Sequence, residues 1–246
     1  MGALPAEVSG VIKRLVRDGA GPTLSIDLQV EVGLIRGRTV VVTATGDGAL
    51  RAARLGALLD LLSPARVITV GLAGGLDPEL PPGSMVAVQR VLRSNGQLGF
   101  DLEVDMAPPG LVAALQGKVP RSRRGCLYSA DTIVETAEAK ATLWEQLGQP
   151  AGAVVDLETE TYVGACRGRG FPVTVYKVVS DAAHESLPDV ISASVDERGS
   201  VRPARVALAA AFRPRTWETL LRLGRRLHRA SEVLGQVVER HLSSLN

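Results

Sequence analysis

The chain has 246 residues, of which 46% are hydrophobic and 22% charged, a composition that excludes a disordered protein. Its 28 basic and 26 acidic residues leave a net charge of +2, too small for the basic field of a nucleic-acid-binding protein. Only three Phe, two Trp and three Tyr are present, which argues against stacking on single-stranded nucleic acid and leaves core packing to aliphatic side chains.

The cysteines give the first indication of compartment and cofactor. Cys126 and Cys166 lie far apart without histidines at ligand spacing, so we expect neither a disulfide framework nor a metal site, and no cofactor. The start of the chain lacks the apolar core of a signal peptide, and no apolar run reaches the roughly 18 residues that predict a membrane-spanning helix. We therefore expect a cytoplasmic protein.

The first elements in the chain are predicted from Pro, Gly and β-branched residues. Helical spacing of apolar residues predicts a helix over 5–19, with a proline at its start and a glycine at its end. Short β-branched runs predict strands at 23–30 and 38–44, with Gly33 and Gly37 between them.

Beyond residue 47, apolar runs alternate with helical patterns. In chain order we predict a helix at 48–62, strands at 66–71 and 84–92, a loop at 93–109, a strand at 124–130, a helix at 136–147, a strand at 153–156, a helix at 158–169, a strand at 171–180 and amphipathic helices over about 214–243. Strands that are apolar on both faces need helices on both sides. The chain is therefore predicted to be one α/β domain, residues 1–246, with a central mixed β-sheet flanked by helices.

Two glycine-rich segments, at 44–50 and 70–80, follow predicted strands, where ligands of α/β sheets bind. The first contains Gly46 and Gly48, but Arg51 stands where a dinucleotide fingerprint needs its third glycine. The next strand also has no acidic residue at its tip for a ribose, so an NAD site is disfavoured. For both segments the alternative is a tight turn between a strand and a helix.

Carboxylates at strand ends are the best candidates for chemistry. Asp156–Leu157 and Glu158 close one strand, and Ser180 with Asp181 closes the next. An acid that ends a buried strand is typically a helix cap or a catalytic group. Glu7 and Glu158 have a simpler alternative, a solvated acid in the first turn of a helix.

Four ordered segments carry a resemblance to the nucleoside phosphorylase/nucleosidase superfamily: GALPAEV, VGLAGGLDPELPPGSMVAV, VVDLETETYVGAC and VYKVVSDAAHE. Within it the chain resembles the methylthioadenosine/S-adenosylhomocysteine nucleosidases. It is similar also to the hopanoid-associated phosphorylase-like branch, through AGGLDPELPPG, SADTIVETAEAKATL and the tail FRPRTWETLLRLGRR. The match runs from residue 2 to about 230.

The resemblance implies cleavage of the N-glycosidic bond of a purine nucleoside, commonly by a homo-oligomer. Asp181 then corresponds to the aspartate that protonates or hydrogen-bonds the purine N7, Glu158 to the glutamate that binds the ribose hydroxyls, and Glu7 to the glutamate that activates water. The further substrate-binding residues that the resemblance implies are Leu157, Ala73, Gly74, Gly75, Ile133, Val134 and Ser180. These roles suit the chemistry, since the reaction needs a protonated leaving group and a positioned oxygen nucleophile.

Water and phosphate remain alternative nucleophiles. Thr45, Gly46 and Gly48 form a candidate pocket for phosphate or for the nucleophile, whereas Glu7 nearby would repel phosphate and favours water. The hopanoid-like resemblance favours instead a phosphorylase that acts on an adenosylated lipid, with phosphate as co-substrate. A third alternative is a relative that binds a nucleoside without turnover.

The chain departs from the family pattern in four places. Only Met1 precedes the GALPAEV segment, where the family has a strand, so either the start is truncated or another segment fills that central position. Lys177 stands where arginine is usual, four residues before Asp181, and loses the planar fork of a guanidinium. Ile133 replaces a phenylalanine that stacks on the base, and Ser84 replaces an aspartate.

The C-terminal helical region is rich in arginine. An arginine face on an amphipathic helix can bind an anionic membrane, but such helices more often cover a core with a solvated basic face. We favour the second interpretation. The arginines concerned are Arg213, Arg215, Arg222, Arg225, Arg226 and Arg229.

Overall fold

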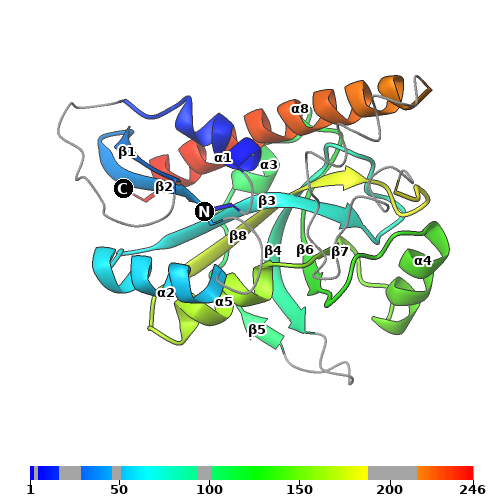
Figure 1. Ribbon diagram of the computed structural model, residues 1–246, viewed down its shortest axis with the longest axis horizontal. Coiled ribbons are helices and arrows are strands. Elements are labelled where there is room, and N and C mark those ends of the chain that lie inside the picture. Colours follow the sequence, from blue (N-terminus) through cyan, green and yellow to red (C-terminus); the bar gives the residue numbers. More distant parts are fainter. Residues whose placement is uncertain (3–4, 17–28, 46–50, 94–100, 188–214, 246) are drawn as a thin grey trace.

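A computed structural model describes residues 1–2, 5–16, 29–45, 51–93, 101–187 and 215–245 (Figure 1). Its strands are β1 (Gln29–Ile35), β2 (Arg38–Ala44), β3 (Val67–Gly75), β4 (Met85–Arg93), β5 (Asp101–Glu103), β6 (Ser122–Ser129), β7 (Val154–Asp156) and β8 (Val173–Asp181). Its helices are α1 (Pro5–Ile12), α2 (Arg51–Leu62), α3 (Leu111–Ala114), α4 (Ala137–Gln146), α5 (Thr159–Arg167) and α8 (Arg215–Ser243).

The central sheet is mixed, as predicted. Its strand order is β5-β4-β6-β7-β3-β8, and β4 also pairs with β8, so the sheet curls round on itself. The pairs β3–β8, β4–β6 and β6–β7 are parallel, whereas β3–β7 and β4–β8 are antiparallel. The carboxyl ends of β3 and β8 thereby meet at the pair Gly74–Asp181, and the short antiparallel β7 lies beside the same end of β3 through the pairs Gly74–Val155 and Gly75–Val154.

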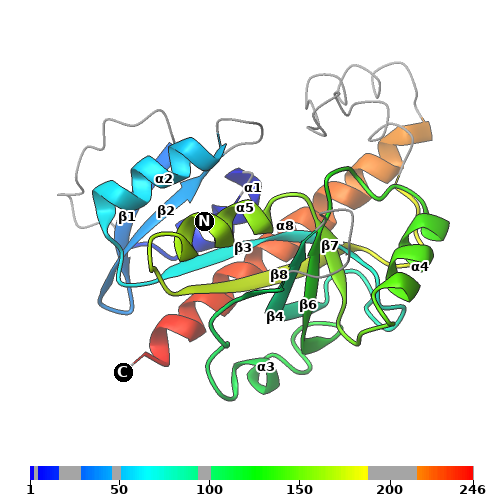
Figure 2. The same ribbon diagram turned by 90° about the horizontal axis from the view of Figure 1, so that it is seen from below.

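Helices cover both faces of this sheet. Figures 1 and 2 show α1 and α8 together on one face and α2 and α5 together on the other. The core on the α8 side includes Val8, Val70, Tyr176, Leu234 and Val237. The core on the α5 side includes Leu55, Leu59, Val86, Tyr162 and Val175. Two of the few aromatic rings, those of Tyr162 and Tyr176, are thus fully buried in the fold.

The N-terminal elements differ from their predicted bounds. The first helix ends at Ile12 rather than at residue 19, because Val16 pairs with Leu34 of β1 through two backbone hydrogen bonds of 2.9 Å. Gly33, predicted to lie in a turn, belongs to β1, where a Cβ atom would lie 2.9 Å from the carbonyl oxygen of Val16. The turn is formed by Arg36 and Gly37, both with positive φ, as in tight hairpins. Residues 23–28 of the predicted strand lie outside the described residues.

The later elements follow the prediction with two additions and one extension. β3 continues to Gly75, through the segment predicted as a ligand loop. The predicted loop 93–109 contains β5, and α3 was not predicted at all. The C-terminal region forms one helix, α8, whose buried Leu234 and Val237 pack towards α1 and the sheet, as expected of a helix that covers a core. Among the described residues, no helix combines the length and apolar character needed to span a membrane.

The first two residues occupy the central position between β2 and β3. The ammonium group of Met1 donates to the carbonyl oxygen of Ile68 at 2.6 Å, and the amide of Val70 donates to the carbonyl oxygen of Met1 at 2.7 Å. On the other side, the amide of Gly2 donates to the carbonyl oxygen of Thr43 at 3.2 Å. Met1 and Gly2 therefore link the β1–β2 hairpin to the main sheet as a strand would.

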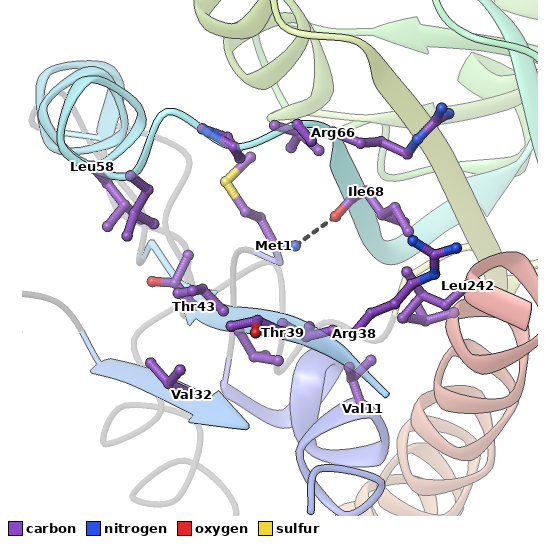
Figure 3. Close-up of a pocket in the computed structure, with 18 of the residues that line it drawn as sticks. Met1, Val11, Val32, Arg38, Thr39, Thr43, Leu58, Arg66, Ile68 and Leu242 are labelled. Carbon is purple, nitrogen blue, oxygen red and sulfur yellow. Dashed lines mark hydrogen bonds between the residues drawn. The ribbon is translucent and has the colours of Figure 1, made fainter. Parts of the chain in front are cut away.

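Beside Met1 lies a cavity of about 700 Å³ between the hairpin and β3 (Figure 3). Its lining is mainly apolar and includes Leu58, Ile68 and Leu242. Burial lowers the pKa of the Met1 amino group to about 6. Neither the strand-end acids nor Glu7 line this cavity, so it is distinct from the candidate site described below.

His241 provides a test of the packing of α8. Its Nδ1 shares a hydrogen bond of 2.6 Å with the hydroxyl of fully buried Tyr176, and burial lowers its pKa to about 4. The unfolded side chain binds a proton near pH 6.5, whereas the folded one stays neutral to about pH 4. Stability is therefore lost as pH falls between these values, by about 3 kcal/mol.

We expect His241→Gln, which keeps an acceptor for Tyr176, to weaken the pH dependence of the free energy of unfolding between pH 6.5 and 4. Urea titrations across this range measure it. The control is His228→Gln, which changes an exposed histidine of the same helix and should keep the wild-type slope. An unchanged slope in the His241 variant would contradict the assignment.

Candidate active site

Glu7 and Lys177 meet beneath β3 at Gly71. Glu7 is buried on α1, and its Oε1 accepts a hydrogen bond of 2.9 Å from the amide of Leu72. A Cβ atom on Gly71 would lie 2.9 Å from Nζ of Lys177 and 3.0 Å from Oε1 of Glu7. Glycine at this position thus lets two charged side chains approach the β3 backbone.

Asp156, at the end of β7, is the centre of a buried polar network. Its Oδ2 forms an ion pair with Nζ of Lys177 at 2.7 Å, and its Oδ1 accepts from the hydroxyl of Ser129 at 3.3 Å. The backbone amides of Glu158 and Thr159 donate to the same Oδ1 at 3.3 and 3.2 Å. Asp156 therefore fixes both the lysine and the start of α5, which Glu158 precedes.

The electrostatics of Lys177 follow from this network. Desolvation lowers its pKa, but the charges of Asp156 and Glu7, with a smaller contribution from Glu158, outweigh burial and raise the pKa above its usual range. The side chain is 3% exposed and stays an ammonium. One buried cation is thus surrounded by three carboxylates.

Asp181 ends β8 beside Gly74 of β3. Its Oδ1 accepts a hydrogen bond from the hydroxyl of Ser180, and its Oδ2 is ion-paired with Lys140 of α4. The hydroxyl of Ser180 also lies 3.2 Å from the carbonyl oxygen of Ala73. Asp181 lies four positions after Lys177 on β8, or about 13 Å along a strand. The two groups therefore mark two ends of one site along β3 and β8.

The other predicted site residues have mixed positions. Thr45 is buried, and its hydroxyl lies 2.8 Å from that of Tyr162. Gly46 and Gly48 lie outside the described residues. Ala73, Gly74 and Gly75 lie at the site, but as strand residues and not as a loop.

The remaining candidates lie on the connections after β6 and β7. Ile133 and Val134, between β6 and α4, are half-buried, and Val134 packs against the buried cluster that contains Cys126 and Val155. Part of its role is thus structural. Leu157 is half-buried beside Glu158, which precedes α5.

Two residues of this site were not predicted. Asp156 was noted only as the end of a strand, although an acid that closes a buried strand was the signal used for its neighbours. Lys140 was not singled out, because a lysine on a helix is ordinarily solvent-exposed. Its side chain is only 1% exposed, and it lies 41 residues before its partner Asp181.

The position of Glu7 depends on a close contact between α1 and α8. A Cβ atom on Gly10 would lie 2.0 Å from the carbonyl oxygen of Ser231 in α8. We expect Gly10→Ala to separate the two helices and to lower the free energy of unfolding by roughly 1–3 kcal/mol. The control is Gly164→Ala in α5, where a Cβ atom meets nothing within 4 Å and alanine should stabilise the helix. Chemical denaturation measures both, and equal stabilities would contradict the close contact.

Comparison with known proteins places this geometry in a family. The family model of the phosphorylase superfamily matches residues 1–212. A 5′-methylthioadenosine/S-adenosylhomocysteine nucleosidase of Marinomonas sp. (strain MWYL1) is 29% identical over 207 residues, which cover 76% of this chain and 87% of that protein. A nucleosidase of the same name from Shewanella oneidensis is 25% identical over 215 residues, 81% of this chain and 89% of that protein.

Solved structures share the fold. The 5′-methylthioadenosine/S-adenosylhomocysteine nucleosidase of Colwellia psychrerythraea, in complex with adenine, superposes with a TM-score of 0.69 at 22% identity, covering 99% of this chain and 93% of that one. Futalosine hydrolase of Helicobacter pylori has a TM-score of 0.70 at 16% identity, covering 99% and 96%. These similarities confirm the predicted nucleoside phosphorylase-like fold, and the family match over most of the chain confirms the resemblance seen in the sequence. The chain belongs to the phosphorylase superfamily.

Proposed function

We propose that the protein hydrolyses the N-glycosidic bond of an adenosine-type nucleoside such as 5′-methylthioadenosine or S-adenosylhomocysteine. The observation that supports this proposal is that Glu7 contacts the β3 backbone at Leu72, that Asp181 ends β8 beside Gly74 of the same strand, and that Glu158 acts on Lys177 together with Glu7. The relatives named nucleosidases, at up to 29% identity over most of this chain, support the substrate class.

Each acid has one task in the proposed reaction. The oxygen of water attacks C1′ of the ribose while its proton passes to Glu7. The electron pair of the C–N bond goes to the purine, and N7 receives the proton of Asp181 in its carboxylic acid form, so that a neutral base leaves and Asp181 becomes the carboxylate paired with Lys140. Glu158 holds the ribose hydroxyls and stabilises the positive charge that develops on the sugar.

The charges of the site favour water over phosphate. A phosphorylase needs cationic or amide donors for an anion beside the sugar. Lys177 is a cation that interacts with Glu7, and its ammonium is ion-paired with Asp156 at 2.7 Å. A phosphate dianion there would meet the carboxylates of Glu7 and Glu158, whereas a water molecule has no such penalty.

The test is product identity with methylthioadenosine and adenosylhomocysteine, each with and without phosphate. We expect adenine and the free ribose sugar at equal rates in both buffers. If sugar 1-phosphate forms, and only when phosphate is present, the reaction is phosphorolysis and not hydrolysis. If no base is released from either substrate, the protein is not a nucleosidase of this class.

A further inference from the structure

Lys140 is a buried charge that the proposed reaction does not yet use. It lies in the first turn of α4, and its side chain is 1% exposed. Burial of an ammonium group is costly unless every hydrogen finds an acceptor. Here the three hydrogens have three acceptors: Oδ2 of Asp181, the carbonyl oxygen of Ala182 at 3.0 Å and the carbonyl oxygen of Glu185 at 2.7 Å.

The surroundings of Lys140 are fixed from both sides. The helix start is capped by Thr136, whose hydroxyl accepts from the amide of Ala139 at 3.1 Å. The segment after β8 is tied to the same region, since the amide of Leu187 donates to the carbonyl oxygen of Glu135 at 2.8 Å. The lysine therefore links α4 rigidly to the end of β8, and its ammonium group is ion-paired with the carboxylate of Asp181.

This bridge selects between the two oxygens of Asp181. Oδ2 lies between Lys140 and Gly74, where a Cβ atom would approach it to 3.2 Å. Oδ1 receives the hydroxyl of Ser180 and keeps its second lone pair. Once Oδ2 is held by a cation, Oδ1 is the oxygen that remains for the proton of the base.

We propose that Lys140 is a positioning residue for glycosidic-bond cleavage, which holds Asp181 by Oδ2 so that Oδ1 faces the purine N7. The proposal rests on the proposed function, because it assigns Lys140 a role through Asp181. Lys140 itself touches no substrate and transfers no proton. It acts on the leaving group and leaves the nucleophile at the Glu7 end unaffected.

The experiment compares Lys140→Met with wild type on two leaving groups. Methylthioadenosine needs a proton on its base, whereas a 4-nitrophenyl riboside releases a stable anion without one. For methylthioadenosine we expect kcat to fall on the order of 10²-fold, the scale of one misplaced general acid, with KM little changed. The nitrophenyl riboside should be cleaved at nearly the wild-type rate. Lys140→Arg keeps the charge and should restore most of the activity on methylthioadenosine.

Arg226→Met is the matched control. Arg226 binds the same segment after β8, through two contacts of 3.0 Å with the carboxylate of Glu185 and one of 3.4 Å with the carbonyl oxygen of Ser180. Its charge also acts on Asp181, but the direct ion pair with the Asp181 carboxylate is made by Lys140. Its loss should lower the melting temperature, but it should not lower the activity on methylthioadenosine relative to that on the nitrophenyl riboside. If Lys140→Met does not fold, Lys140→Gln, whose amide still donates to carbonyl oxygens, takes its place.

Three results would overturn the proposal: equal losses on both leaving groups, no loss on either, or no rescue by arginine. Failure of the proposed function is seen separately, in the wild type, as no adenine released. A wild type that cleaves methylthioadenosine and a Lys140→Met variant that cleaves it equally well would reject only the role of Lys140.

Discussion

Replacement of Asp181 by asparagine should lower kcat for methylthioadenosine by roughly 10²–10⁴-fold, the contribution typical of a general acid. Asparagine keeps an oxygen that accepts from Lys140 or Ser180, so the end of β8 should keep its place. It cannot deliver a proton to N7, so the base would have to leave as an anion. Steady-state kinetics, with product identified by chromatography, measure the loss.

Binding separates catalysis from recognition in this variant. Adenine affinity, measured by calorimetry, should change far less than kcat, since an amide still forms a hydrogen bond with the base. Asp60→Asn, which changes an exposed carboxylate paired with Arg169 at 2.7 Å, is the control and should keep full activity. A wild-type kcat in the Asp181 variant would remove Asp181 from the role of acid.

The sequence predicted the strands best where β-branched residues form a run between turn residues. β2 has its predicted bounds, Arg38–Ala44, because the run VVVTA follows a glycine turn and has no competing pattern. β3 is longer than predicted. Its last residues, Ala73–Gly75, have poor strand propensity, so the local sequence does not mark them as a strand, but pairing with β7 and β8 holds them in one. Such long-range pairing cannot be inferred from local composition.

The candidate site shows the same difference between local sequence signals and long-range contacts. Asp181 and Glu158 are candidates from the sequence because acids that follow apolar strands carry a local signal. The contact between Lys140 and Asp181 joins residues 41 positions apart, and that between Glu7 and the amide of Leu72 joins residues 65 apart. These contacts depend on the topology of the sheet, which brings the ends of β3, β7 and β8 together, and they cannot be predicted from the local sequence.

Conversion of Glu7 to glutamine is the second change expected to have a large effect. The glutamine oxygen can still accept from the amide of Leu72, so α1 should stay against β3. The variant loses the base that takes the proton of water, and kcat should fall by roughly 10²–10⁴-fold. The control is Glu232→Gln on α8, which weakens an ion pair with Lys13, directly after α1, but leaves Glu7 unchanged, and should keep its activity.

Phosphate then distinguishes two roles of this carboxylate. If Glu7 acts as the base in a site that binds no phosphate, the variant is slow in every buffer, because water is no longer activated. If Glu7 mainly repels anions, its neutralisation leaves Lys177 with less surrounding negative charge, and phosphate should accelerate the variant with formation of sugar 1-phosphate. The first result supports a hydrolase built around a buried base. The second result would mean that the site uses water and not phosphate as the nucleophile because several carboxylates surround Lys177.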